Sequence, residues 1–131
     1  MIFIDEKDFE AIVSRAIDSL PGQYIDNMKN VAIIVEDEPS QAQRQQMHLV
    51  NGVTLFGLYE GIPLTNRGGN YSLVLPDKIT IFKNPILASC NNLEELKSQI
   101  KRTVWHEIAH HYGLDHEDMQ KILEKKQEKT N

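Results

Sequence analysis

Four of the chain's five histidines stand within residues 106–116, which read His-Glu-Ile-Ala-His-His-Tyr-Gly-Leu-Asp-His. Residues four apart on a helix lie one above the other, so His106 and His110 can direct imidazole nitrogens at one ion. Gly113 can adopt a left-handed conformation that ends the helix and brings His116 back to the same ion. Three histidines leave a tetrahedral zinc with one open position, which is the arrangement of a catalytic site.

Glu107 directly follows the first of these histidines. At that position its carboxylate can hold and deprotonate a water on the ion, as a general base does. Asp115 precedes the third histidine, and we expect it to brace a ligand histidine by a hydrogen bond. The spacing therefore predicts a zinc hydrolase with His106, His110 and His116 as ligands. It does not select Zn²⁺ over iron, cobalt or manganese, because three imidazoles accept several of these metals.

Two residues around the Gly-, Pro- and Asn-rich segment 61–70 are candidates for substrate binding. Arg67 can extend into a cleft and stabilise an oxyanion, and Tyr71 flanks the same segment. The alternatives are a solvated loop arginine and a tyrosine that packs at a strand end, which is also the prediction for Tyr59.

The other histidines and the cysteine are predicted to be structural. His111 projects toward the apolar side of its helix, and we expect a core histidine with a hydrogen-bond partner. His48 stands in a polar stretch and is predicted to be a solvated surface residue. Cys90 is predicted to be an inert thiol in a loop near the start of the helix that carries the motif.

The metal-binding motif requires a long helix that positions it. Asn92 is the predicted N-cap, with Glu95 three residues on, and the helix is predicted to run to about Tyr112. His106 and His110 lie off its apolar arc, toward a different face, as ligands in a cleft should. The residues that form the arc and are predicted to face the core are Leu93, Leu96, Ile100, Val104 and Ile108.

The remaining elements complete an α+β domain. Helical spacing predicts a first helix over Phe9–Leu20, ended by Pro21-Gly22, and a shorter helical piece around Tyr24–Met28. Residues 36–51 are predicted to form a surface loop or an irregular helix, and the tail after Asp118 a fraying helix. Apolar and β-branched runs predict strands at Val31–Val35, Thr54–Tyr59, Tyr71–Leu75 and Lys78–Phe82. With a turn at Pro76-Asp77 between the last two strands, the prediction is a small, mostly antiparallel sheet packed on helices, with the motif on a long C-terminal helix.

Length and composition restrict the class of protein. The 131 residues suit one domain spanning 1–131, and a formal net charge of -5 argues against a broad nucleic-acid-binding surface. Cys90 is the single cysteine, which fits a reducing compartment. The N-terminal residues show no signal-peptide pattern and no stretch has the length of a membrane span, so we expect a cytoplasmic protein.

Residues 106–115 resemble the signature of the minimal zincin-like metallopeptidases, a family of short bacterial proteins. The resemblance continues upstream through residues 31–39, 57–65 and 75–80, and so extends over most of the chain. It implies a zincin-like fold, with His106 and His110 as ligands and Glu107 as general base. The family commonly has an acidic residue where this chain has His116, and either side chain can fill that ligand position.

The resemblance implies a metallopeptidase, and we expect its substrate to be a peptide or an unfolded protein. An extended substrate can add as a strand to an exposed sheet edge, for which Tyr71–Leu75 is the candidate. Because no second domain walls the cleft, we expect a shallow site, with either modest activity or dependence on a protein partner that completes the cleft.

Two other classes of function use the same residues. The spacing His106, His110, Gly113, Asp115 and His116 also resembles the motif of bacterial rRNA-maturation endoribonucleases, but that motif does not require Glu107. Salt-dependent RNA binding would favour this interpretation. A non-catalytic adaptor, in which zinc holds a peptide-binding fold, would load zinc fully while Glu107 stayed dispensable.

Overall fold

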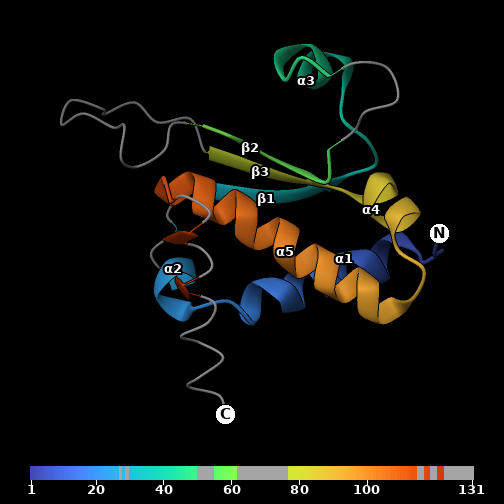
Figure 1. Cartoon of the computed structure of the whole chain (residues 1–131), viewed down its shortest axis with the longest axis horizontal. Coiled ribbons are helices and arrows are strands. Elements are labelled where there is room, and N and C mark those ends of the chain that lie inside the picture. The colour runs from blue at the N-terminus through green and yellow to red at the C-terminus, as the bar shows by residue number, and fades with distance from the viewer. Residues whose placement is uncertain are drawn as a thin grey trace.

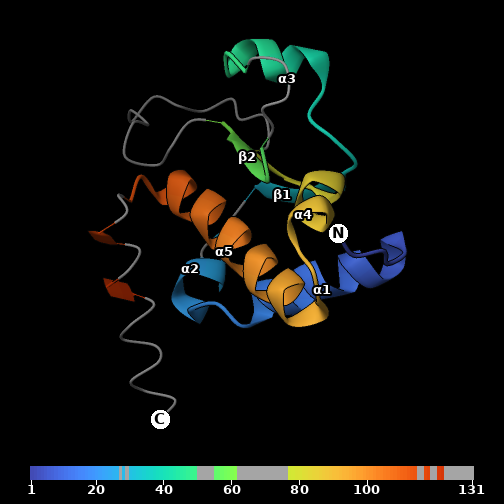
Figure 2. The same cartoon turned by 45° about the vertical axis from the view of Figure 1, so that its right-hand side comes forward.

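Figure 1 shows the computed structural model of the chain, which describes residues 1–26, 28, 30–49, 55–61, 77–114, 117–118 and 121–122. Its elements follow in the order α1, α2, β1, α3, β2, β3, α4 and α5. The helices α1 and α5 lie on one side of a small sheet and α3 lies on the other, as both views show (Figures 1 and 2).

The sheet has three described strands in the order β1-β3-β2. They are β1 (Val31–Glu36), β2 (Gly57–Glu60) and β3 (Asp77–Phe82). The central β3 pairs in parallel with β1 and antiparallel with β2, so these strands form a mixed sheet rather than a mostly antiparallel one. The predicted strand Tyr71–Leu75, and the hairpin that would contain it, lie outside the described residues.

The first two helices occur where helices were predicted, and each begins and ends two or three residues earlier than predicted. Helix α1 (Glu6–Asp18) begins at Asp5, whose side chain accepts a hydrogen bond from the Asp8 N–H, and it buries an apolar face against α5. Helix α2 (Gly22–Asp26) is held to the end of α5, because the hydroxyl of Tyr112 donates to the carbonyl of Tyr24. The residues of α1 that reach the core are Phe9, Ile12, Val13 and Ala16.

Two short helices flank the sheet. Helix α3 (Gln41–Gln46) begins with a capping box in which the Ser40 and Gln43 side chains each accept from the other's backbone N–H. The Gln43 side chain also donates to Glu60 Oε1 over 3.0 Å, which joins α3 to β2. Helix α4 (Lys83–Ser89) directly follows β3 and was not predicted; Pro85 lies in its first turn, where proline is tolerated.

Helix α5 (Leu93–Tyr112) is the long helix that the motif requires. Its N-cap is Asn92, which accepts from the Glu95 N–H over 2.9 Å, and it ends at Gly113 in a left-handed conformation with φ of 70°. Both ends therefore match the prediction. Leu93 was predicted to face the core, and this prediction was wrong. It is 46% exposed, because it lies in the first turn of α5, beyond the core. The fully buried arc residues are Leu96, Ile100, Val104 and Ile108.

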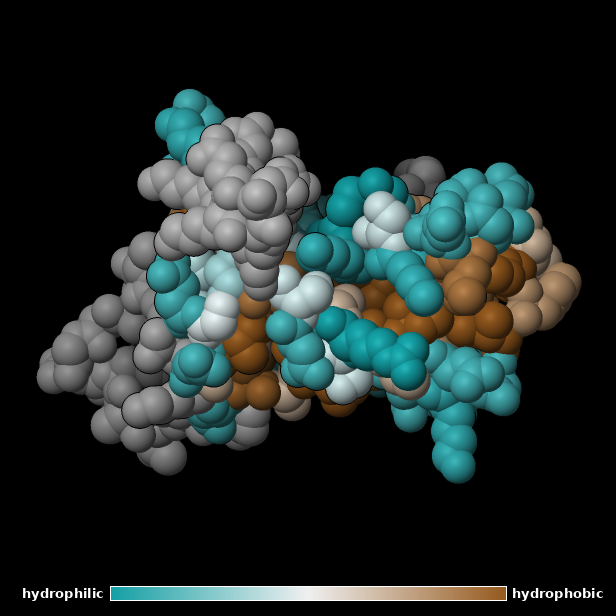
Figure 3. Space-filling model, turned by 90° about the horizontal axis from the view of Figure 1, so that it is seen from below, coloured by the Kyte–Doolittle hydropathy of each residue, from teal (hydrophilic) through white to brown (hydrophobic). Residues whose placement is uncertain are grey.

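Seen from the helical side, hydrophilic residues lie over much of the surface and apolar residues show between them (Figure 3). The exposed large hydrophobic residues at the N-terminus and the start of α5 are Met1, Phe3 and Leu93. Among the described residues, no helix combines the length and the apolar character needed to cross a bilayer.

Candidate active site

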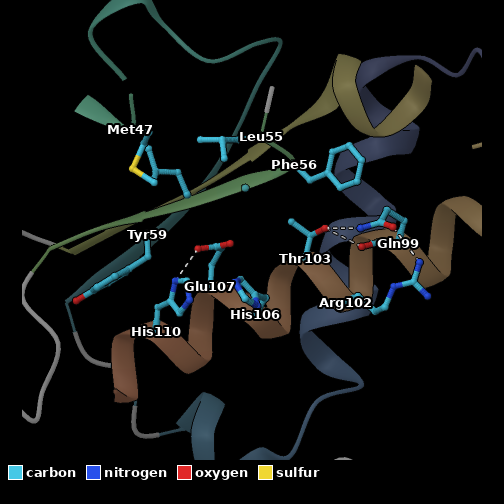
Figure 4. Close-up of a pocket in the computed structure, with 12 residues that line it drawn as sticks. Met47, Leu55, Phe56, Tyr59, Gln99, Arg102, Thr103, His106, Glu107 and His110 are labelled. Atoms are coloured by element: carbon cyan, nitrogen blue, oxygen red, sulfur yellow. Dashed lines mark hydrogen bonds and ion pairs between the residues drawn. The ribbon is translucent and has the colours of Figure 1, made fainter. Parts of the chain in front are cut away.

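A pocket of about 550 Å³ lies between α5 and the strand β2 (Figure 4). Helix α5 forms one wall, and β2 with the two residues before it forms the other. Met47, just after α3, closes part of the rim. The α5 residues that line the pocket are Gln99, Arg102, Thr103, His106, Glu107 and His110, and the facing residues are Leu55, Phe56, Gly57, Leu58 and Tyr59.

His106, Glu107 and His110 come together at one end of this pocket. Their ligand atoms all lie within 4.8 Å of one another, and the two imidazole rings are 4.3 Å apart between centroids. His106 is partly buried, Glu107 is buried and His110 is exposed. The helical spacing thus places both predicted ligands and the predicted base on one face of α5, as the sequence indicated.

Burial makes the Glu107 carboxyl group a weaker acid than an exposed glutamate. Its side chain is 7% exposed, and the resulting loss of hydration raises its pKa from 4.5 to about 7. A hydrogen bond from the backbone of Tyr59 acts in the opposite direction, and Nδ1 of His110 lies 3.2 Å from Oε1 of Glu107. The carboxyl group therefore exchanges its proton near neutral pH.

Gly57 allows β2 to approach the helix this closely. A Cβ atom at this position would lie 2.7 Å from Cγ2 of Thr103 and 3.2 Å from Cγ of Glu107. Any larger residue there would require the Thr103 side chain, the strand or the helix to move, so glycine permits the narrow separation that buries Glu107.

A buried hydrogen-bonded group fixes β2 and β3 relative to α5. Oδ2 of Asp77 accepts from the Tyr59 hydroxyl over 2.7 Å and lies 2.9 Å from Nδ1 of His111. The Tyr59 and His111 rings also pack edge to face. His111 is 1% exposed and Asp77 is 2% exposed, so each needs the other as a partner.

This group decides three sequence predictions. His111 is confirmed as a core histidine with a hydrogen-bond partner, and Tyr59 is confirmed as a residue that packs at a strand end. Asp77, predicted to be a turn residue, begins β3 with its carboxylate buried. The turn prediction was wrong because the partners of Asp77 are distant in sequence, and only the sheet brings them together. His48 is exposed, as predicted, and Cys90 lies buried between α4 and α5, while its inertness stays a prediction.

Four predicted site residues lie outside the described residues. They are the third ligand His116, its neighbour Asp115, and the two substrate-binding candidates Arg67 and Tyr71. Their roles stay predictions.

Several lining residues were not singled out from the sequence. Thr103 and Arg102 each lie four residues before a site residue, Glu107 and His106 respectively, so helical spacing alone could have placed them on the pocket face. Met47 gave no such signal, because it reaches the pocket only through the docking of α3 on β2.

The sequence matches the profile of the zincin-like metallopeptidases over residues 28–125. The chain belongs to this family. The match spans β1 to the motif helix, and so includes every described element that lines the pocket of this zincin-like protein. The suspected family is therefore confirmed, together with the α+β fold class of a small sheet and a long C-terminal helix.

A solved structure shares this fold. It is that of a conserved hypothetical protein from Thermus thermophilus, with a TM-score of 0.55 and 20% sequence identity. The similarity covers 82% of the present zincin-like chain and 92% of the other. No curated protein matches the sequence.

Proposed function

We propose that this chain is a zinc-dependent metallopeptidase that hydrolyses peptide bonds with Glu107 as general base. The observation that carries the proposal is the convergence of His106, Glu107 and His110 within 4.8 Å at one end of a pocket. Membership of the zincin-like family supports the same function.

The donor set fits zinc. Two imidazoles on successive turns of one helix have their nitrogens close enough to share an ion, and imidazole is a preferred zinc ligand. In this proposal His106 and His110 bind the ion, and His116 is the third ligand. Bound zinc supplies Lewis acidity, which polarises a substrate carbonyl and lowers the pKa of a coordinated water.

Glu107 has the acidity that a general base needs. A base works best when its pKa lies near the operating pH, and in the metal-free protein burial raises the pKa of Glu107 to about 7. In the reaction that we propose, a carboxylate oxygen of Glu107 takes the proton of the attacking water and later gives it to the leaving amine. The Tyr59 backbone hydrogen bond orients the carboxylate for both steps.

The pocket suits an extended peptide. Its wall opposite the helix is mainly apolar, formed by Leu55, Phe56 and Leu58, and apolar walls bind apolar side chains. We propose that flexible or unfolded segments are the substrates, and that a protein partner completes the cleft.

Metal content tests the binding site. Untagged protein, reconstituted with zinc and dialysed, should hold about one zinc per chain by elemental analysis. His106→Ala and His116→Ala should lose the metal or bind it much more weakly. His48→Asn, which removes an exposed histidine that does not line the pocket and keeps a residue type that tolerates its left-handed backbone, is the matched control and should load like the wild type. Absence of metal in the wild type would refute the proposal.

Hydrolysis tests the role of Glu107. Glu107→Gln should retain zinc and lose at least about a hundredfold in kcat/KM on unfolded casein or a fluorogenic peptide mixture, because the proton acceptor is gone. Glu94→Gln, an exposed carboxylate in the first turn of the same helix, should retain full activity. Unchanged hydrolysis in Glu107→Gln would rule out the mechanism.

The two alternative functions predict other results with the same protein variants. A ribonuclease of the rRNA-maturation type would cleave RNA and bind it in a salt-dependent manner. Against it, Arg102 is the one lysine or arginine among the described residues that line the pocket. A zinc-containing adaptor would bind peptides without cleaving them, in the wild type and in Glu107→Gln alike.

A further inference from the structure

We infer that Arg102 forms a carboxylate-binding subsite of this pocket and selects peptides that carry a carboxylate near the scissile bond. The inference rests on the proposed peptidase function. Figure 4 shows Arg102 on α5, toward the end of the pocket away from His110, with Gln99 and Thr103 beside it.

The guanidinium of Arg102 is held in place by neutral groups. Its Nη2 donates to Oε1 of Gln99 over 2.9 Å, and the Gln99 amide donates to Oγ1 of Thr103 over 3.0 Å. The Thr103 hydroxyl in turn donates to the Gln99 carbonyl over 2.8 Å, and Thr103 is buried. A solvated arginine normally loses much rotational freedom when it binds a ligand. Arg102 is exposed, and its hydrogen bond to Gln99 restrains the side chain, which reduces the entropy lost on binding.

The positive charge of Arg102 has no carboxylate partner among the described residues. Its guanidinium donates to the uncharged side chains of Ser98 and Gln99. Glu95 lines an adjoining hollow, but its carboxylate accepts from the backbone of Asn91 and the side chain of Asn92 at the helix cap. Guanidinium groups bind carboxylates through paired hydrogen bonds, so the unmatched charge suits a substrate carboxylate.

The spacing along α5 sets the place of this carboxylate in a substrate. Arg102 precedes Glu107 by five residues, a rise of about 7.5 Å. An extended peptide spans that distance in roughly two residues. The subsite therefore lies about two residues from the bond whose hydrolysis Glu107 assists as general base.

The facing wall adds a second requirement. Phe56 lines both this pocket and the adjoining hollow beside Arg102, and Met47 and Leu55 lie across from the helix. A substrate that contacts both Arg102 and the facing apolar wall has a bulky apolar side chain next to its carboxylate. That carboxylate can come from an acidic side chain or from the peptide C-terminus.

The test uses zinc-loaded protein and peptides that share a neutral, amidated decapeptide with a central leucine and carry an uncharged fluorophore without a carboxylate. One set moves a single glutamate along the sequence, and a second replaces it by glutamine. A third set has neutral side chains and a free C-terminus in place of the amide, so that its one carboxylate is the terminal one. Binding is measured by anisotropy with Glu107→Gln, and hydrolysis with the protein that retains Glu107. Arg102→Gln is introduced into both proteins, and Lys101→Gln, an adjacent exposed cation that does not line this pocket, is the matched control.

We expect one glutamate position, or the free C-terminus, to improve binding about ten- to a hundredfold, and Arg102→Gln alone to abolish the gain. Equal affinity for acidic and neutral peptides, equal losses in Lys101→Gln, or no binding of any peptide would overturn the subsite. Selective binding without hydrolysis would support the subsite and refute the peptidase function. Hydrolysis that Arg102→Gln leaves unchanged for every peptide would support the peptidase function and refute the subsite.

Discussion

At the scale of single residues, Glu107 combines a chemical role with a cost to folding. A carboxylate that is removed from water destabilises the folded protein when it is charged, and the hydrogen bond from Tyr59 compensates only in part. Glu107 is therefore well suited to accept a proton near neutral pH, but its charged form lowers the stability of the folded protein.

The pKa of Glu107 predicts how stability depends on pH. Its pKa is about 7 in the folded protein and 4.5 when the side chain is fully hydrated, as in the unfolded chain, so between these values the folded state binds more protons than the unfolded state. The free energy of unfolding of metal-free protein should therefore fall as pH rises from 4.5 to 7, by roughly 3 kcal/mol from this group.

Urea unfolding in the presence of a chelator at pH 5 and pH 8 measures this contribution. Glu107→Gln cannot ionise, so it should lose this part of the pH dependence and be more stable than the wild type at pH 8. Glu94→Gln should behave like the wild type. If the free energy of unfolding changed equally between pH 5 and pH 8 in the wild type and in Glu107→Gln, ionisation of Glu107 would not account for the pH dependence.

At the scale of elements, the separation of β2 from α5 determines the pocket. Gly57→Ala would place a methyl group 2.7 Å from Thr103, between a strand and a helix that are each held by other contacts. We expect a loss of about 1–3 kcal/mol in the free energy of unfolding, together with weaker hydrolysis because Glu107 is displaced.

Chemical denaturation and the peptide assay measure these two effects. Gly22→Ala is the control, because a Cβ atom there would meet its nearest atom at 3.7 Å, an ordinary contact. Equal stability of the two variants would show that the strand adapts without cost.

The elements also show what the sequence could and could not predict. Local signals located α5 well, since Asn92 and Gly113 mark its ends and helical spacing brings His106, Glu107 and His110 together. The role of Asp77 could not be predicted, because its partners Tyr59 and His111 become neighbours only when three distant segments pack. The same holds for the parallel pairing of β1 with β3, which no local pattern specifies.

At the scale of the whole molecule, metal binding and folding are coupled. Zinc that binds only the folded chain should raise the free energy of unfolding by about 2.7 kcal/mol at a free concentration a hundred times Kd. For a domain of 131 residues this corresponds to a rise of roughly 10 °C in Tm. Thermal unfolding with and without zinc measures the shift. His106→Ala should show none, and an unchanged Tm in the wild type would contradict zinc binding at this site.

The order of strands in the sheet has a consequence for how the chain reaches this structure. Neither β1 nor β2 pairs with the other, and both take β3 as their partner. Among the described residues the strand partner of Val31 is Asp77, so the described sheet cannot assemble on a ribosome until the chain has emerged through Phe82. Pairing across such long separations is slow, and it leaves the apolar strand β1 unpaired during synthesis, when it is exposed to aggregation.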